Sequence, residues 1–169
     1  MEVAYETSRL LLTVFQQKDL DATKHFWGDA YVMEYSGGAT PHEKLSQVLE
    51  GYEKCHQEKG LSVYAVTEKS TGKVIGAAGF NISDSVEKIE LIYHFSKPSW
   101  GKGFATEAAK ACIEIAKRLQ HVELIYASAD PHNLDSTKIL EKIGFKFIEM
   151  RWFEDTNQNE PYYEYLVRK

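Results

Sequence analysis

The chain has 169 residues, with 20 Lys and Arg against 25 Asp and Glu, a formal net charge of −5 and a hydrophobic fraction of 43%. A length of this order is typical of one domain, so we expect a single domain over residues 1–169. The acidic balance argues against nucleic acids and anionic membranes as partners, and the apolar fraction excludes a disordered chain.

Several classes of protein and site are disfavoured by what the sequence lacks. No apolar run approaches the roughly 20 residues that span a bilayer, and the first ten residues do not resemble a signal peptide. The two cysteines, Cys55 and Cys112, stand far apart, which favours reduced thiols. No paired Cys or His spacing typical of a metal site occurs, so we predict no metal. These features together favour the cytoplasm.

In the first half of the chain, apolar spacing predicts two helices, over 18–30 and 40–60. Thr40 and Glu43 have the spacing of a capping box at the start of the second helix. Runs of β-branched and aromatic residues predict strands over 9–15, 61–68, 73–82 and 87–95.

The second half predicts helices and strands in alternation. The predicted elements are helices over 103–119 and 133–143, strands over 122–127, 146–150 and 162–167, and a polar loop over 154–160. A crossover that joins two strands through a helix should be parallel and right-handed. The predicted fold class is α/β (α+β), a mixed and mostly antiparallel central sheet with helices on both faces.

One loop carries the main chemical signal. Gly101 and Gly103 lie between the end of a predicted strand and the start of a predicted helix. Glycines allow a tight turn that exposes N–H groups, and the first helical amides have no internal partners. Such a loop can hold a phosphate, with Lys102 as an added charge, although a plain glycine turn is the alternative. The Walker pattern is absent, and Thr106 occupies the position of a third dinucleotide-loop glycine.

Three segments resemble the GNAT N-acetyltransferase superfamily. WGKGFATEA resembles its acyl-CoA pyrophosphate loop, Q/R-x-x-G-x-G/A, with Gly103 and Ala105 at the last two fixed positions and Trp100 at the first. The segment from Asn133 to Phe145 resembles its N-x-x-S helix and E-K-x-G-F turn. TSRLLL, over 7–12, resembles the first strand of the branch that holds the ribosomal-protein alanine N-acetyltransferases.

The resemblance implies a GNAT-like fold and direct attack of an amine on acetyl-CoA as co-substrate. It implies that the main chain of one loop holds the pyrophosphate, over Gly101, Lys102, Gly103, Phe104, Ala105 and Thr106. It implies that the preceding strand splays from its parallel neighbour and pairs with the pantetheine arm through Tyr93, His94 and Phe95. An N–H near Phe95 would stabilise the oxyanion. Asn133 would reach the same region, a role that is compatible with capping a helix.

For proton transfer, the resemblance points to Ser136 and Glu90. Many members carry a Tyr four residues after the serine, where this chain has Leu140, so Ser136 becomes the candidate acid. Its alternative role is packing of the helix. Glu90 lies on the strand before the loop, where burial would raise its pKa and suit it as a base, unless it faces solvent. His94 is a second candidate base, although we favour a strand-surface role for its side chain.

The acceptor side is expected at two segments, 27–35 and 151–161, which combine aromatic and acidic residues. Carboxylates would attract a cationic amine, and aromatic rings would line the walls. The leading acceptor is a protein N-terminal α-amine. A polyamine or an aminoglycoside is the alternative, and a non-catalytic acyl-CoA-binding module is a third reading. The resemblance is also compatible with a homodimer.

Overall fold

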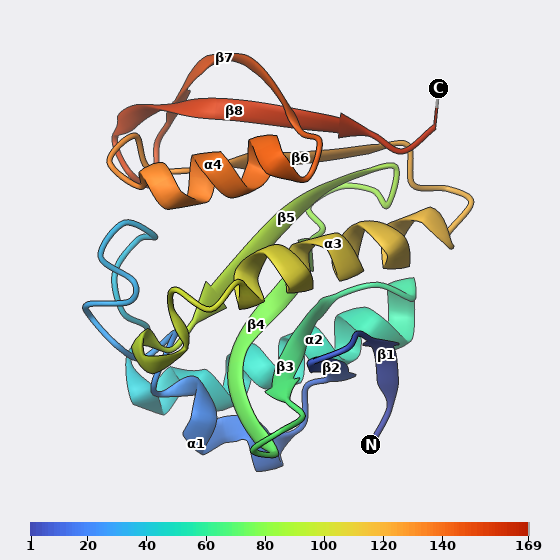
Figure 1. Cartoon of the computed structure of the whole chain (residues 1–169), viewed down its shortest axis with the longest axis vertical. Coiled ribbons are helices and arrows are strands. Elements are labelled where there is room, and N and C mark those ends of the chain that lie inside the picture. The colour runs from blue at the N-terminus through green and yellow to red at the C-terminus, as the bar shows by residue number, and fades with distance from the viewer. Residues whose placement is uncertain (169) are drawn as a thin grey trace.

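Eight strands form one sheet with the order β1-β2-β3-β4-β5-β6-β8-β7 (Figure 1). The computed structural model describes residues 1–168. The pair β5–β6 is parallel and the other neighbouring pairs are antiparallel, so the predicted mixed sheet is confirmed. The strands are β1 (Val3–Glu6), β2 (Leu10–Val14), β3 (Val63–Glu68), β4 (Lys73–Asn81), β5 (Lys88–Phe95), β6 (Leu124–Ser128), β7 (Lys146–Phe153) and β8 (Gln158–Leu166).

Helices cover both faces of this sheet. They are α1 (Leu20–Thr23), α2 (Leu45–Lys59), α3 (Phe104–Lys117) and α4 (Leu134–Lys142). One core lies under α3 and α4, where Ala108, Ala109 and Cys112 are completely buried. Such small side chains let α3 approach the sheet closely. A second core lies on the opposite face, where Phe15 packs with side chains of α2.

The helix predicted over 18–30 is wrong beyond its first turns. A 3-10 turn over Gln17–Asp19 and α1 form, and turns follow them. The Asp29 carboxylate accepts hydrogen bonds from the N–H groups of Tyr31 and Val32, at 2.9 Å each. Asp side chains that bond to nearby main chain compete with helix formation. The apolar spacing of this segment therefore reflects burial of Phe26 and Trp27 in successive turns.

The predicted capping box at Thr40 is also wrong. The Thr40 side chain caps no helix, and its N–H donates to the carbonyl of Trp27 at 2.8 Å. A short 3-10 turn over His42–Lys44 leads into α2 instead. The segment before α2 is thus fixed by a main-chain contact with the turns after α1.

The C-terminal hairpin is longer than predicted, and β1 was not predicted. β7 and β8 extend to Phe153 and from Gln158, so the polar loop expected over 154–160 shrinks to four residues. Asn157 takes a positive φ of 54° in this connection, a conformation that Asn tolerates well. Polar residues such as Gln158 and Glu160 have low strand propensity, and their pairing with β7 overrides it.

The parallel neighbours β5 and β6 separate part-way along their length. Only three pairs join them, from Lys88 with Leu124 to Glu90 with Tyr126, although β5 continues to Phe95. On its other side, β5 pairs with β4 along its whole second half. The Ser96 N–H donates a hydrogen bond to the carbonyl of Ile75, on the side of β4. Because main-chain groups point to alternate sides along an antiparallel strand, those of Tyr93 and Phe95 point away from β4, toward the gap between β5 and β6.

Candidate active site

A cavity of about 830 Å³ lies where β5 leaves β6. Its size falls within the range of small-molecule sites. Ten of the twelve predicted site residues line it, namely Glu90, Tyr93, His94, Phe95, Gly101, Gly103, Phe104, Ala105, Asn133 and Ser136. Lys102 and Thr106 are not part of the lining. Side chains from both predicted acceptor segments, among them Tyr31 and Glu160, complete the wall.

The glycine loop presents a row of unpaired amides. Gly101 and Gly103 have φ angles of +76° and +81°, which glycine adopts without strain. Within residues 1–168, no N–H from Gly101 to Thr106 donates a hydrogen bond. The indole N–H of Trp100 donates to the carbonyl of Phe95 at 2.8 Å and so ties the loop to β5. Unpaired amides at the start of a helix such as α3 fit an anion chemically.

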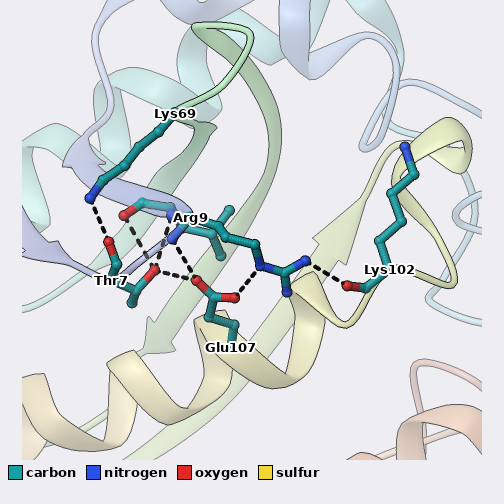
Figure 2. Close-up of polar contacts among 6 residues, drawn as sticks. Thr7, Arg9, Lys69, Lys102 and Glu107 are labelled. Carbon is teal, nitrogen blue, oxygen red and sulfur yellow. Dashed lines mark hydrogen bonds and ion pairs between the residues drawn. The ribbon is translucent and has the colours of Figure 1, made fainter.

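A polar clamp from the connection between β1 and β2 holds this loop (Figure 2). Arg9 Nε donates to Glu107 Oε1 at 2.7 Å, and its Nη1 donates to the carbonyl of Lys102 at 2.9 Å. Thr7 Oγ1 donates to Glu107 Oε2 at 2.5 Å. Burial acts to raise the pKa of Glu107, but the hydrogen bonds from Thr7 and Arg9 outweigh it and hold the pKa below its ordinary value. The Arg9 guanidinium also lies over the Phe104 ring.

We expect Arg9→Lys to raise the KM for the ligand of this loop several-fold and to leave kcat at saturation nearly unchanged. A lysine keeps the charge but cannot bridge Glu107 and the Lys102 carbonyl as the planar guanidinium does. Steady-state kinetics on Arg9→Lys and on Arg118→Lys, an exposed control at the other end of α3, check this. An Arg9→Lys enzyme with unchanged KM would contradict a positioning role for the clamp.

Ser136 and Tyr93 form a hydroxyl pair across the gap. Tyr93 Oη lies 3.0 Å from Ser136 Oγ and 3.2 Å from the Ser136 carbonyl oxygen. Burial raises the pKa of Tyr93 to about 12, so its hydroxyl stays protonated at neutral pH. Asn133 Oδ1 accepts the N–H of Ser136 at 3.2 Å, which confirms it as the α4 N-cap. The tyrosine partner of Ser136 was not foreseen, although the hydrophobic Leu140 gave a reason to look for a phenol elsewhere.

The side chain of Glu90 is half-buried and is connected by hydrogen bonds to a side chain of α2. Its Oε1 accepts from Asn81 Nδ2 at 3.4 Å, and Asn81 Oδ1 accepts from Tyr52 at 3.1 Å. Burial raises the pKa of Glu90, the Asn81 contact lowers it, and the charges of Asp155 and Glu160 raise it further. The net shift is upward, which suits a carboxylate that must take up and release a proton near neutrality.

The geometry of His94 does not suit a base. Trp27 Nε1–H donates to His94 Nδ1 at 3.2 Å, so in the neutral ring the proton lies on Nε2. Burial lowers the pKa of His94 to about 4, because a charged imidazolium would be poorly solvated there. The ring therefore offers the cavity an N–H donor at neutral pH. The partnership with Trp27 was not visible in the sequence.

The sequence model of the family described as acetyltransferase (GNAT) domain matches residues 9–146 of this chain. The chain belongs to the GNAT acetyltransferase family. The uncharacterized N-acetyltransferase p20 of Bacillus licheniformis is 31% identical over 150 residues, which are 86% of this chain and 83% of that protein. The ribosomal protein uS5 alanine N-acetyltransferase of Escherichia coli is 29% identical over 93 residues, 54% of this chain and 48% of that protein.

Solved GNAT structures share the fold. An acetyltransferase of the GNAT family from Bacillus anthracis superposes with a TM-score of 0.84 at 24% identity, over 99% of both chains. A spermidine N-acetyltransferase from Vibrio cholerae, solved with CoA and spermine, superposes with a TM-score of 0.78 at 19% identity, over 95% of this chain and 97% of that one. The expected GNAT fold is therefore confirmed.

In this GNAT domain, the cavity has an acidic wall. It carries six carboxylates and, among the described residues, no Lys or Arg; the six are Glu34, Glu90, Asp130, Asp135, Asp155 and Glu160. Glu160 is buried and accepts hydrogen bonds from Thr156 Oγ1 at 2.8 Å and Gln158 Nε2 at 3.0 Å. Asp130 is held by Gln158 at 2.7 Å. The segment predicted as a polar loop thus supplies two of the six carboxylates, Asp155 and Glu160.

Within residues 1–168, no helix combines the length and apolar character that crossing a membrane requires. In the same described part of the chain, no three His, Cys, Asp or Glu side chains converge to hold a metal ion. Cys55 and Cys112 are free thiols.

Proposed function

We propose that this protein is an N-acetyltransferase that moves the acetyl group of acetyl-CoA to a primary amine. The observation that carries the proposal is that two stretches of main chain with unpaired groups meet in one cavity. The amides from Gly101 to Thr106 fit an anionic diphosphate. The main-chain groups of Tyr93 and the N–H of Phe95, whose carbonyl is bonded to Trp100, fit an extended amide-containing arm. The residues present therefore fit acetyl-CoA as substrate.

The catalytic roles follow from positions and pKa shifts. Glu90 takes the proton of the acceptor ammonium, directly or through water, so that the amine lone pair can attack the thioester carbon. The C–N bond forms, the Phe95 N–H facing the gap stabilises the oxyanion, and the C–S bond then breaks. The Ser136–Tyr93 pair donates a proton to the departing thiolate. The extra proton on the new amide nitrogen passes through solvent to this pair, and Glu90 returns its proton to solvent between turnovers.

The acidic wall supports a cationic acceptor. An ammonium group is attracted to clustered carboxylates, and the aromatic side chains of Tyr31 and Tyr35 offer apolar contact beside them. A protein N-terminal α-amine is our leading acceptor, in line with the relative that acetylates a ribosomal protein. A polyamine is the second candidate, because several carboxylates along one wall can face several ammonium groups, and a GNAT neighbour was solved with spermine.

An acceptor screen tests the proposal. The protein is mixed with acetyl-CoA, a thiol reagent and one amine at a time, from peptides with free α-amines to polyamines, aminoglycosides and a neutral amine control. We expect free thiol to appear only with certain cationic amines, with a 42 Da mass gain of the acceptor expected for one acetyl group. Tight CoA binding without turnover on any amine would favour a non-catalytic acyl-CoA-binding module.

A further inference from the structure

β7 forms one edge of the sheet (Figure 1). It presents large apolar side chains to solvent. Within residues 1–168, β8 is the only strand that pairs with it. Its exposed fractions are 52% for Phe147, 46% for Ile148, 51% for Met150 and 54% for Trp152. An open edge with exposed apolar residues is a template for pairing with another strand.

The main-chain groups of Met150 point out of the sheet. Met150 lies opposite Pro161 of β8, and a proline has no N–H. This pair therefore cannot exchange both hydrogen bonds, so it is a non-hydrogen-bonded pair of the antiparallel ladder. In such a pair the N–H and C=O groups face the other side of the strand. Met150 thus offers a free donor and a free acceptor at the edge.

We propose that β7 pairs with β7 of a second copy of this chain, antiparallel, around a two-fold axis at Met150. Opposed residues of an antiparallel ladder share a face, so the axis passes through one residue. With the axis at Met150, Met150 meets its own copy, Ile148 meets Trp152, and Glu149 meets Arg151, the last two contacts each occurring twice. Apolar residues then face apolar residues, and opposite charges face each other.

Neighbouring registers lack this complementarity. An axis at Glu149 or at Arg151 places like charges directly opposite, which destabilises a strand pair. An axis at Trp152 places Met150 opposite Glu154, and an axis at Ile148 places Phe147 opposite Glu149. The charge pattern of β7 therefore selects one register.

The charged pair is already arranged for such a contact. Arg151 Nε lies 3.2 Å from Glu149 Oε2 of its own strand, and the guanidinium lies 3.6 Å from the Tyr162 ring centre. In the dimer, each Arg151 would lie between Glu149 of its own strand and Glu149 of the second copy. The register shift between Phe147 and Glu149 bends the strand, and bulges limit edge pairing, so the new ladder is confined to residues 148–152.

Cysteine cross-linking tests the axis. Mutually hydrogen-bonded residues have Cα atoms about 5.5 Å apart, within the range of a disulfide. In a Cys55→Ser background, Met150→Cys should form a disulfide-linked dimer under mild oxidation, seen on a non-reducing gel. Glu149→Cys and Arg151→Cys should cross-link to each other when mixed and much less to themselves. Failure of Met150→Cys to cross-link, or equal self-linking of Glu149→Cys, overturns the proposal.

Charge exchange tests the same register without cysteines. Light scattering should give the mass of a dimer for the unchanged chain and of a monomer for Glu149→Arg. The double variant Glu149→Arg with Arg151→Glu should restore the dimer, because both opposed pairs are again of opposite charge. A monomeric unchanged chain, or a double variant no better than the single one, overturns the proposal. Acetyl transfer is measured separately, and its absence would leave these outcomes unaffected.

Discussion

Replacing Gly101 by valine is expected to weaken coenzyme A binding about tenfold or more. Gly101 has a φ of +76°, and a Cβ there meets nothing within 4 Å. The effect must therefore come from the backbone, where an L-residue in the left-handed region costs about 1–2 kcal/mol and a β-branched one is a clear outlier. The loop would relax by turning its amides away from the ligand. Isothermal titration calorimetry with coenzyme A measures the change in Kd.

The matched control is Gly72→Val. Gly72 has nearly the same φ, +73°, also meets nothing within 4 Å, and lies in the turn between β3 and β4. Both variants should lose a similar free energy of unfolding in a urea titration, whereas Gly72→Val should keep the Kd of the unchanged protein. Equal coenzyme A affinity in the two variants would mean that the loop does not hold the diphosphate.

Glu90→Gln is expected to lower kcat/KM by about 10²- to 10⁴-fold, the range of general acid–base catalysis. The ionised carboxylate is the active form, so the rate of the unchanged enzyme should fall as the pH drops through the raised pKa of Glu90. Because that pKa lies above the ordinary value of 4.5, this acidic limb should lie closer to neutrality than an unperturbed glutamate would place it. Glutamine keeps the shape and cannot titrate, so the limb should disappear. A pH profile of kcat/KM measures both effects.

Ser136→Ala separates the base from the acid. It removes the hydroxyl paired with Tyr93 but leaves Glu90 in place, so turnover should fall while the acidic limb remains and the Kd for coenzyme A changes little. If Ser136→Ala has full activity, the serine packs α4 and Tyr93 alone remains as the proton donor. A Glu90→Gln enzyme with an unchanged acidic limb would assign the base to another group.

Local patterns identified most of the sheet and three of the helices because their apolar periodicity coincides with their burial. The segment after α1 was mispredicted because Asp29 bonds to the main chain and because Phe26 and Trp27 are buried from separate turns. The length of the C-terminal hairpin was underestimated because Gln158 and Glu160 join a strand through cross-strand pairing, which no local propensity reveals.

In the site, the glycine loop and the order of the surrounding segments could be anticipated. The parts that escaped prediction are contacts between residues far apart in the chain. Tyr93 reaches Ser136 across 43 positions, and Trp27 reaches His94 across 67. The sequence contained each side chain, but only the separation of β5 from β6 shows which atoms meet in the cavity.

The clamp of Figure 2 also determines how late in synthesis the glycine loop can reach its final structure. Arg9 and Glu107 are separated by 98 positions, and Arg9 directly precedes β2, which is held by its pairing with β3. A ribosome must therefore release more than half of the chain before the first strands can brace the glycine loop. We therefore expect a fusion partner or trimming at the amino end to disturb the glycine loop, although Lys102 of that loop lies 93 positions beyond Arg9.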